Sequence, residues 1–185
     1  ISFKLNSNPV VLELSEKQTN KGLTSFISKD KIRFQDLLPQ NLQSDIKGIS
    51  DAKLELNIST FQRGLKYIES PSIDLYSNLK GTEIKISEPF LKPASEIIDL
   101  KISFSPFYID NKSQVKFSYG DLLRGKLHFY EKNIEGFLIA GKEKQSISVE
   151  SGIVSLIGNI EKLDYALFNN LDSRLSDSTI NFQVK

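Results

Sequence analysis

The feature that most constrains the fold of this chain is an alternation of apolar and polar residues with a period of two. It is clearest in four runs, at 52–58, 98–104, 115–119 and 180–184. Successive side chains of a β-strand point to opposite faces of a sheet, so each run predicts a strand with one apolar and one polar face. Weaker runs of the same kind lie at 3–5, 11–14, 73–76, 84–86, 127–130, 137–140, 146–149 and 153–157.

Short polar connections separate these predicted strands. The segments 80–81, 110–113 and 150–152 consist mainly of Asn, Asp, Ser, Gly and Lys, which is typical of hairpin turns. Short links of this kind predict antiparallel neighbours. Proline cannot donate to a strand ladder, so the prolines that flank or interrupt strands mark strand ends or exposed edges. They are Pro71, Pro89, Pro93 and Pro106.

Two segments depart from the period of two and predict short amphipathic helices. Leu38, Leu42 and Ile46 are spaced by four residues, which predicts a helix over 37–46. A leucine at every fourth residue from Leu163 to Leu175 predicts a second helix over 164–175. Each helix precedes a strand.

The two helix-then-strand regions also resemble each other in sequence. Within the units at 37–58 and 164–184, residues 38–58 align with residues 167–184, with one short insertion in the first region. The similarity is either a coincidence or a large internal repeat with many strands per unit, longer than ordinary solenoid repeats. With either reading, residues 1–185 are expected to form a single β-rich body. The predicted fold class is mainly β, a curved antiparallel sheet or a β-sandwich with two short amphipathic helices.

The composition excludes several classes of function. Lys and Arg number 24 against 23 Asp and Glu, so the net charge of +1 predicts no nucleic-acid partner. The chain has no Cys, which removes thiolate metal sites and cysteine nucleophiles. The longest apolar runs are four residues, which predicts no transmembrane segment.

No catalytic motif or metal-binding pattern is present in the sequence. The single histidine, His128, is predicted to lie exposed on the polar face of a strand. There is no Gly-x-Ser-x-Gly elbow, no glycine-rich phosphate loop and no carboxylate cluster with metal-ligand spacing. Carboxylates brought together only by folding are not detectable in this way. We therefore expect a protein that is not an enzyme and uses no cofactor or metal.

The order of features from residue 82 onward resembles that of the AsmA-like superfamily, including type II secretion protein N. The strand at 82–87 is followed by a proline-containing link and a strand at 97–104. Then come the leucine-containing stretch Gly120-Asp121-Leu122-Leu123-Arg124-Gly125 and a hairpin around Gly136. The helix-then-strand unit is also similar to linkers of that superfamily. One departure is Ile134-Glu135-Gly136, where a glycine pair is common.

The resemblance implies a long curved sheet whose apolar concave face holds phospholipid acyl chains, in a periplasmic or other extracytoplasmic protein of the bacterial envelope. Alternation then predicts which side chains line such a groove. They are Leu54, Leu56, Ile58, Leu100, Ile102, Phe104, Phe117 and Phe137. The same residues fit the closed core of a β-sandwich equally well.

Two functions of different classes follow. The first is a non-enzymatic envelope module that binds or conducts lipid along an apolar β groove. The alternative is a β-sandwich structural or interaction module of a virion, tail or surface appendage, which contacts other envelope or assembly proteins through edge strands and loops.

Overall fold

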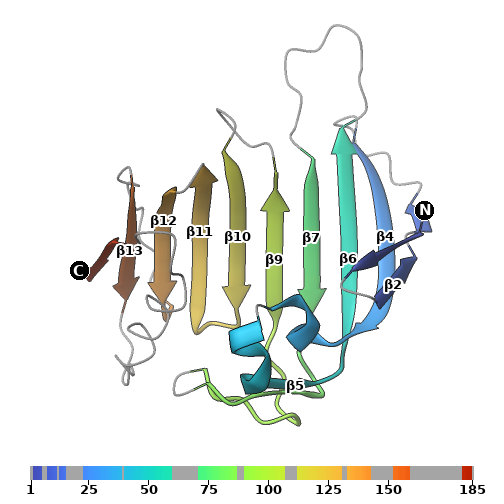
Figure 1. The fold of residues 1–185 in the computed structure, drawn as a ribbon, viewed down its shortest axis with the longest axis horizontal. Helices are drawn as coiled ribbons and strands as arrows, with labels where there is room; N and C mark the ends of the chain where they lie inside the picture. Colours follow the sequence, from blue (N-terminus) through green and yellow to red (C-terminus); the bar gives the residue numbers. More distant parts are fainter. Residues whose placement is uncertain are drawn as a thin grey trace, which may run out of the picture.

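The computed structural model describes residues 2–5, 8–11, 13–15, 23–38, 40–59, 71–86, 90–106, 112–130, 133–142, 152–158 and 181–184. Within these residues, ten strands form one sheet (Figure 1). In order across the sheet they are β14 (Asn181–Val184), β13 (Ile153–Gly158), β12 (Asn133–Ala140), β11 (Leu123–Tyr130), β10 (Ser113–Tyr119), β9 (Leu100–Ser105), β7 (Ser72–Ser77), β6 (Ser50–Ser59), β4 (Leu23–Ile32) and β3 (Glu13–Ser15).

The sheet is antiparallel over most of its width and parallel at its C-terminal side. Every pair from β3 to β12 is antiparallel, whereas β12 pairs with β13, and β13 with β14, in parallel. The hairpin expected at 150–152 would join β13 to the strand predicted at 146–149, and residues 146–151 lie outside the described residues. β13 contains a nearly continuous apolar run, Ile153 to Ile157, interrupted only by Ser155, which is typical of parallel strands covered on both faces.

Two small sheets accompany the large one. β1 (Ser2–Leu5) pairs with β2 (Asn8–Val11), which contacts β4 at the N-terminal side of the sheet. β5 (Ile46–Gly48) pairs with β8 (Thr82–Ile84). The link at 80–81 thus joins β7 to a strand of another sheet, and the expected hairpin at this position is wrong.

The predicted helix over 37–46 is replaced by two 3-10 turns and a strand. The turns are η1 (Phe34–Leu37) and η2 (Gln40–Asp45), and β5 begins at Ile46. Leu38 ends η1 in an extended conformation, with φ −98° and ψ 155°. It precedes Pro39, and the ring of a proline disfavours the α conformation of the residue before it. The spacing of apolar residues by four therefore did not produce an α-helix.

The hydrophobic core lies at one end of the large sheet, where β5, β8 and η1 pack against its apolar face. Figure 1 shows β5 and the 3-10 turns at that end. Buried residues of the sheet and of the covering elements form one cluster, comprising Ile32, Phe34, Ala52, Leu54, Leu75, Leu79, Ile84 and Tyr119. Among the described residues, a small two-stranded sheet and 3-10 turns thus pack on this end of the large sheet.

A buried lysine ties the connection after β8 to the core. Lys92 is 0% exposed, and its Nζ donates hydrogen bonds to the carbonyl oxygens of Leu79 at 2.8 Å, Thr82 at 2.8 Å and Pro93 at 3.1 Å. Its backbone also pairs with that of Ile84. An ammonium group with three carbonyl acceptors is satisfied although it is buried.

The mainly β class predicted from alternation is confirmed. Ten-residue β4 is an addition, because no strand was predicted at 23–32. The expected strand at 146–149, the helix over 164–175 and most of the second repeat unit lie outside the described residues. Gly136, expected in a hairpin, lies inside β12 with φ +148°, where a Cβ atom would approach the carbonyl oxygen of Lys126 within 2.1 Å.

Candidate functional site

The register of the large sheet assigns its side chains to two chemically different faces. Residues directly opposite one another on paired strands share a face, and alternate residues along a strand lie on opposite faces. We call the face that carries Leu54 and Leu56 the apolar face, and the one that carries Lys53 and Glu55 the polar face. Each can be followed across the sheet from one register pair to the next.

The apolar face carries a continuous row that crosses eight strands, from β4 to β13, which we call the first apolar row. Its members pair in succession, so that each lies directly beside the next. Seven of the eight are apolar side chains, and the eighth is a glycine. In order they are Phe26, Leu56, Ile73, Phe104, Val115, Leu127, Gly136 and Val154.

A second apolar row runs parallel to the first, two residues nearer the capped end. It consists of Ser28, Leu54, Leu75, Ile102, Phe117, Gly125, Leu138 and Leu156. Phe117 lies directly over Gly125, where a Cβ atom would be 2.7 Å from the Phe117 ring. The small residue therefore lets an aromatic ring lie flat within the row.

On β6 and β7, burial decreases along the apolar face with distance from the capped end. In the second row Leu54 and Leu75 are 7% exposed, whereas in the first row Ile73 is 39% exposed. Ile58, on the same face one step further along β6, is 40% exposed, whereas Val154 of the first row, on β13, is 3% exposed. On β6 and β7 the end of the apolar face away from β5 and β8 thus presents hydrocarbon side chains to solvent, which is unfavourable unless an apolar ligand or partner covers them.

Seven of the eight predicted groove residues lie on the apolar face. They are Leu54, Leu56, Ile58, Leu100, Ile102, Phe104 and Phe117. Phe137 does not join them, because it pairs with Lys126 and so lies on the polar face. In β12 the residues of both faces are largely apolar, so alternation within the strand does not reveal which set joins its neighbours.

Register also adds residues to the apolar face that the sequence analysis did not select. They include Phe26, Ile73, Val115, Leu127, Leu138 and Val154. Most lie in weaker alternating runs, and Phe26 lies in β4. The sequence did not show which of the stronger runs these weaker runs pair with.

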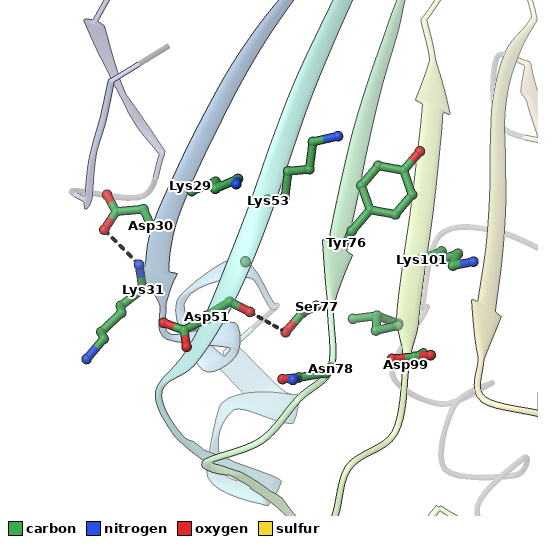
Figure 2. Close-up of a pocket in the computed structure, with 12 residues that line it drawn as sticks. Lys29, Asp30, Lys31, Asp51, Lys53, Tyr76, Ser77, Asn78, Asp99 and Lys101 are labelled. Carbon is green, nitrogen blue, oxygen red and sulfur yellow. Dashed lines mark hydrogen bonds between the residues drawn. The ribbon is translucent and has the colours of Figure 1, made fainter. Parts of the chain in front are cut away.

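The polar face carries two shallow hollows. The first, of about 840 Å³, crosses β4, β6, β7 and β9. Figure 2 shows Lys29, Lys53, Tyr76 and Lys101 along it. The Lys53 ammonium lies 2.6 Å from Glu55 and 5.4 Å from the centre of the Tyr76 ring. Asp30, Asp51 and Asp99 also line this hollow, so its charges nearly balance.

The second hollow, of about 930 Å³, crosses β7 to β12 and has a different charge balance. Its lining includes the four cations Lys101, Lys116, Arg124 and Lys126, but a single carboxylate, Asp74. We call it the basic hollow. Phe137 and Ile139 of β12 form its apolar side.

Among the described residues of the polar face, the most buried titratable group is Glu135, which is 5% exposed. Its Oε1 lies 2.8 Å from Lys112 Nζ and 3.6 Å from His128 Nδ1, and its Oε2 accepts from the Gly152 amide at 3.3 Å. Burial alone raises the pKa of Glu135, but the hydrogen bonds from Lys112, Gly152 and Tyr130 outweigh it and hold the pKa below its ordinary value.

His128 is part of the same cluster. The prediction that it is exposed is wrong. Its side chain is 14% exposed, and its Nε2 lies 2.8 Å from Gln114 Nε2. Burial lowers the pKa of His128, Lys126 lowers it further, and the hydrogen bond with Glu135 opposes both effects. Through Gln114, His128 and Glu135 this cluster joins β10, β11 and β12.

Searches for other kinds of site and for relatives gave negative results. In the described part of the chain, no group of three or more His, Asp or Glu residues is placed to hold a metal ion. No helix among the described residues is long and apolar enough to cross a membrane. No family model, no curated protein and no solved structure matches this chain.

Proposed function

We propose that this chain is a non-enzymatic module of a bacterial envelope, exposed to the periplasm, that binds or conducts phospholipid acyl chains along the apolar face of its sheet. One observation carries the proposal. The first apolar row is continuous across eight strands, and its exposed member Ile73 lies beside the half-buried Leu56 and Phe104. The resemblance to AsmA-like proteins favours the same function.

The dimensions of the first apolar row suit an acyl chain. Eight strands at about 4.8 Å spacing give a row of roughly 34 Å. The hydrocarbon core of a bilayer, about 30 Å thick, contains two layers of acyl chains, so one extended chain fits within the row. Each methylene transferred from water to such a surface contributes about 0.8 kcal/mol, which makes burial of a whole chain favourable without any polar contact.

The proposal is tested by photo-crosslinking from two positions of β7 that differ in the face they occupy. Ile73 and Tyr76 are 39% and 37% exposed, and they lie on the apolar and polar faces respectively. A benzophenone amino acid is placed at either position, and the purified protein is incubated with labelled phosphatidylcholine, whose headgroup carries no net charge. We expect the label to be captured from position 73 and not from position 76. Equal capture from both positions, or none from position 73, would contradict the proposal.

The competing function, a structural or interaction module, predicts a different outcome. A partner that pairs with an edge of the sheet would contact β3 or β14, each of which pairs with one described strand. Capture of a protein from a benzophenone placed in β3 or β14, with no lipid captured from position 73, would favour that function.

A further inference from the structure

The basic hollow concentrates positive charge that the rest of the chain does not explain. The whole chain has a net charge of +1, yet four cations line this hollow beside one carboxylate. Asp74 already accepts hydrogen bonds from Asn57 Nδ2 at 2.8 Å and Ser72 Oγ at 3.1 Å. Among the described residues, Lys101, Lys116 and Arg124 form no ion pair, whereas Lys53 and Lys112 on the same face are paired with glutamates.

Two of these cations face each other directly across neighbouring strands. Lys116 of β10 and Lys126 of β11 are register partners. Like charges in this position repel each other and destabilise a sheet. Lysines are common on edge strands, where they prevent aggregation, but β10 and β11 lie inside the sheet and are paired on both sides. Edge protection therefore does not account for this pair.

The four cations form a compact array with hydroxyl groups between them. Along one register line Lys101, Ser118 and Arg124 lie side by side, and along the next lie Ser103, Lys116 and Lys126. With strands about 4.8 Å apart and residues rising about 3.3 Å each, the array measures roughly 10 by 7 Å. Such an array matches one multiply charged group better than an extended acidic polymer.

The chemistry of the array favours phosphate. A guanidinium group binds phosphate oxygens in pairs, ammonium groups bind them as point charges, and serine hydroxyls donate to them. On β12, the next strand, an apolar side chain lies beside the last cation of each register line. Ile139 pairs with Arg124, and Phe137 pairs with Lys126. A ligand that satisfies both features carries a phosphate group and a hydrocarbon part.

We propose that the basic hollow binds the phosphomonoester headgroup of an anionic lipid through Lys101, Lys116, Arg124 and Lys126, with the adjoining hydrocarbon against Phe137 and Ile139. This site lies on the polar face. The sheet itself separates it from the acyl-chain surface proposed above, and neither proposal requires the other.

Calorimetric titration of the purified chain with three soluble probes tests this inference. The probes are dihexanoyl phosphatidic acid, dihexanoyl phosphatidylcholine with the same chains, and inorganic pyrophosphate, all at one ionic strength. We expect the phosphatidic acid to bind about tenfold more tightly than the phosphatidylcholine. Equal affinity of these two lipids would overturn the inference, and pyrophosphate that binds as tightly as the phosphatidic acid would overturn the assignment to a lipid.

Matched double variants locate the effect. K116Q/K126Q should remove most of the preference for phosphatidic acid, whereas K29Q/K31Q removes the same charge from the first hollow and should retain it. A preference that falls equally in both variants would indicate non-specific attraction and overturn the inference. The K116Q/K126Q variant should fold, because it relieves a like-charge pair. If the wild-type chain does not bind phosphatidylcholine, that result counts against the acyl-chain proposal and not against this inference. Failure of the acyl-chain proposal and failure of this inference are therefore distinguishable.

Discussion

At the scale of single residues, Glu135 shows how the sheet accommodates a buried charge. Its carboxylate is held by Lys112, the Gly152 amide and His128, and these contacts come from segments on both sides of β12. Alternation alone placed His128, which pairs with Glu135, at a solvated position. It could not reveal that Lys112 and Gly152, which lie outside the strands, would cover them.

The lowered pKa of Glu135 predicts a specific acid sensitivity. Its pKa in the folded state lies below the ordinary value of 4.5, so its contribution to stability is complete above about pH 4.5 and is lost as the pH falls through the folded-state pKa. Glu135→Gln should lower the free energy of unfolding by about 2 kcal/mol at neutral pH, because charge-assisted hydrogen bonds are lost. That difference should shrink below pH 4.5, as measured by urea unfolding across pH.

The control for this prediction is Glu83→Gln, which removes a carboxylate in an exposed contact with Lys85 at 3.4 Å. It should change stability by no more than about 0.5 kcal/mol at any pH. Protonation of His128, whose pKa in the folded state is lowered from 6.5, reduces the stability of the fold as the pH falls below 6.5. This effect begins at a higher pH than the loss of the Glu135 contribution. A difference between wild type and Glu135→Gln that stays constant down to pH 3 would refute the assigned role of the carboxylate.

At the scale of elements, the two-stranded sheet β5–β8 and its connection cap the core through one buried lysine. Lys92→Met keeps an unbranched side chain, one atom shorter, and removes the ammonium donor from three carbonyl oxygens, of which those of Leu79 and Pro93 each keep a backbone donor. We expect the free energy of unfolding to fall by about 3 kcal/mol, because three hydrogen bonds to a buried charged group are lost. Urea unfolding measures the change, and Lys80→Met at an exposed neighbouring turn is the control. Equal stability of the two variants would show that the lysine does not secure the cap.

The elements also show what periodicity can and cannot predict. Strands with strict alternation, such as β6 and β10, were predicted close to their observed bounds. β4 was missed because Ser28 and Asp30 occupy its apolar face, where alternation requires hydrocarbon side chains. The four-residue spacing around Leu38 predicted a helix, but the preference of a residue before proline for extended backbone prevailed.

At the scale of the whole molecule, the two faces of one sheet have separate chemistry. Sequence alternation predicted that each strand has an apolar and a polar side, but only register joins these sides into continuous faces. Phe137 illustrates the limit, since residues 137–140 of its strand are apolar on both sides and its pairing with Lys126 places it on the polar face. The order of strands and the parallel pairs at the C-terminal side likewise depend on contacts between residues distant in sequence.

The central claim, that the apolar face holds acyl chains, is tested most directly by native mass spectrometry of the chain purified from a bacterial envelope. The wild-type protein should carry bound zwitterionic phospholipid, which has no phosphomonoester group for the basic hollow, and so should Tyr76→Lys, which adds a charge to the polar face. The double variant Ile58→Lys/Ile73→Lys adds charge to the exposed end of the apolar face and should lose the lipid, because burying an ammonium against hydrocarbon is costly. Wild-type protein without lipid, or a double variant that retains it, would contradict this account.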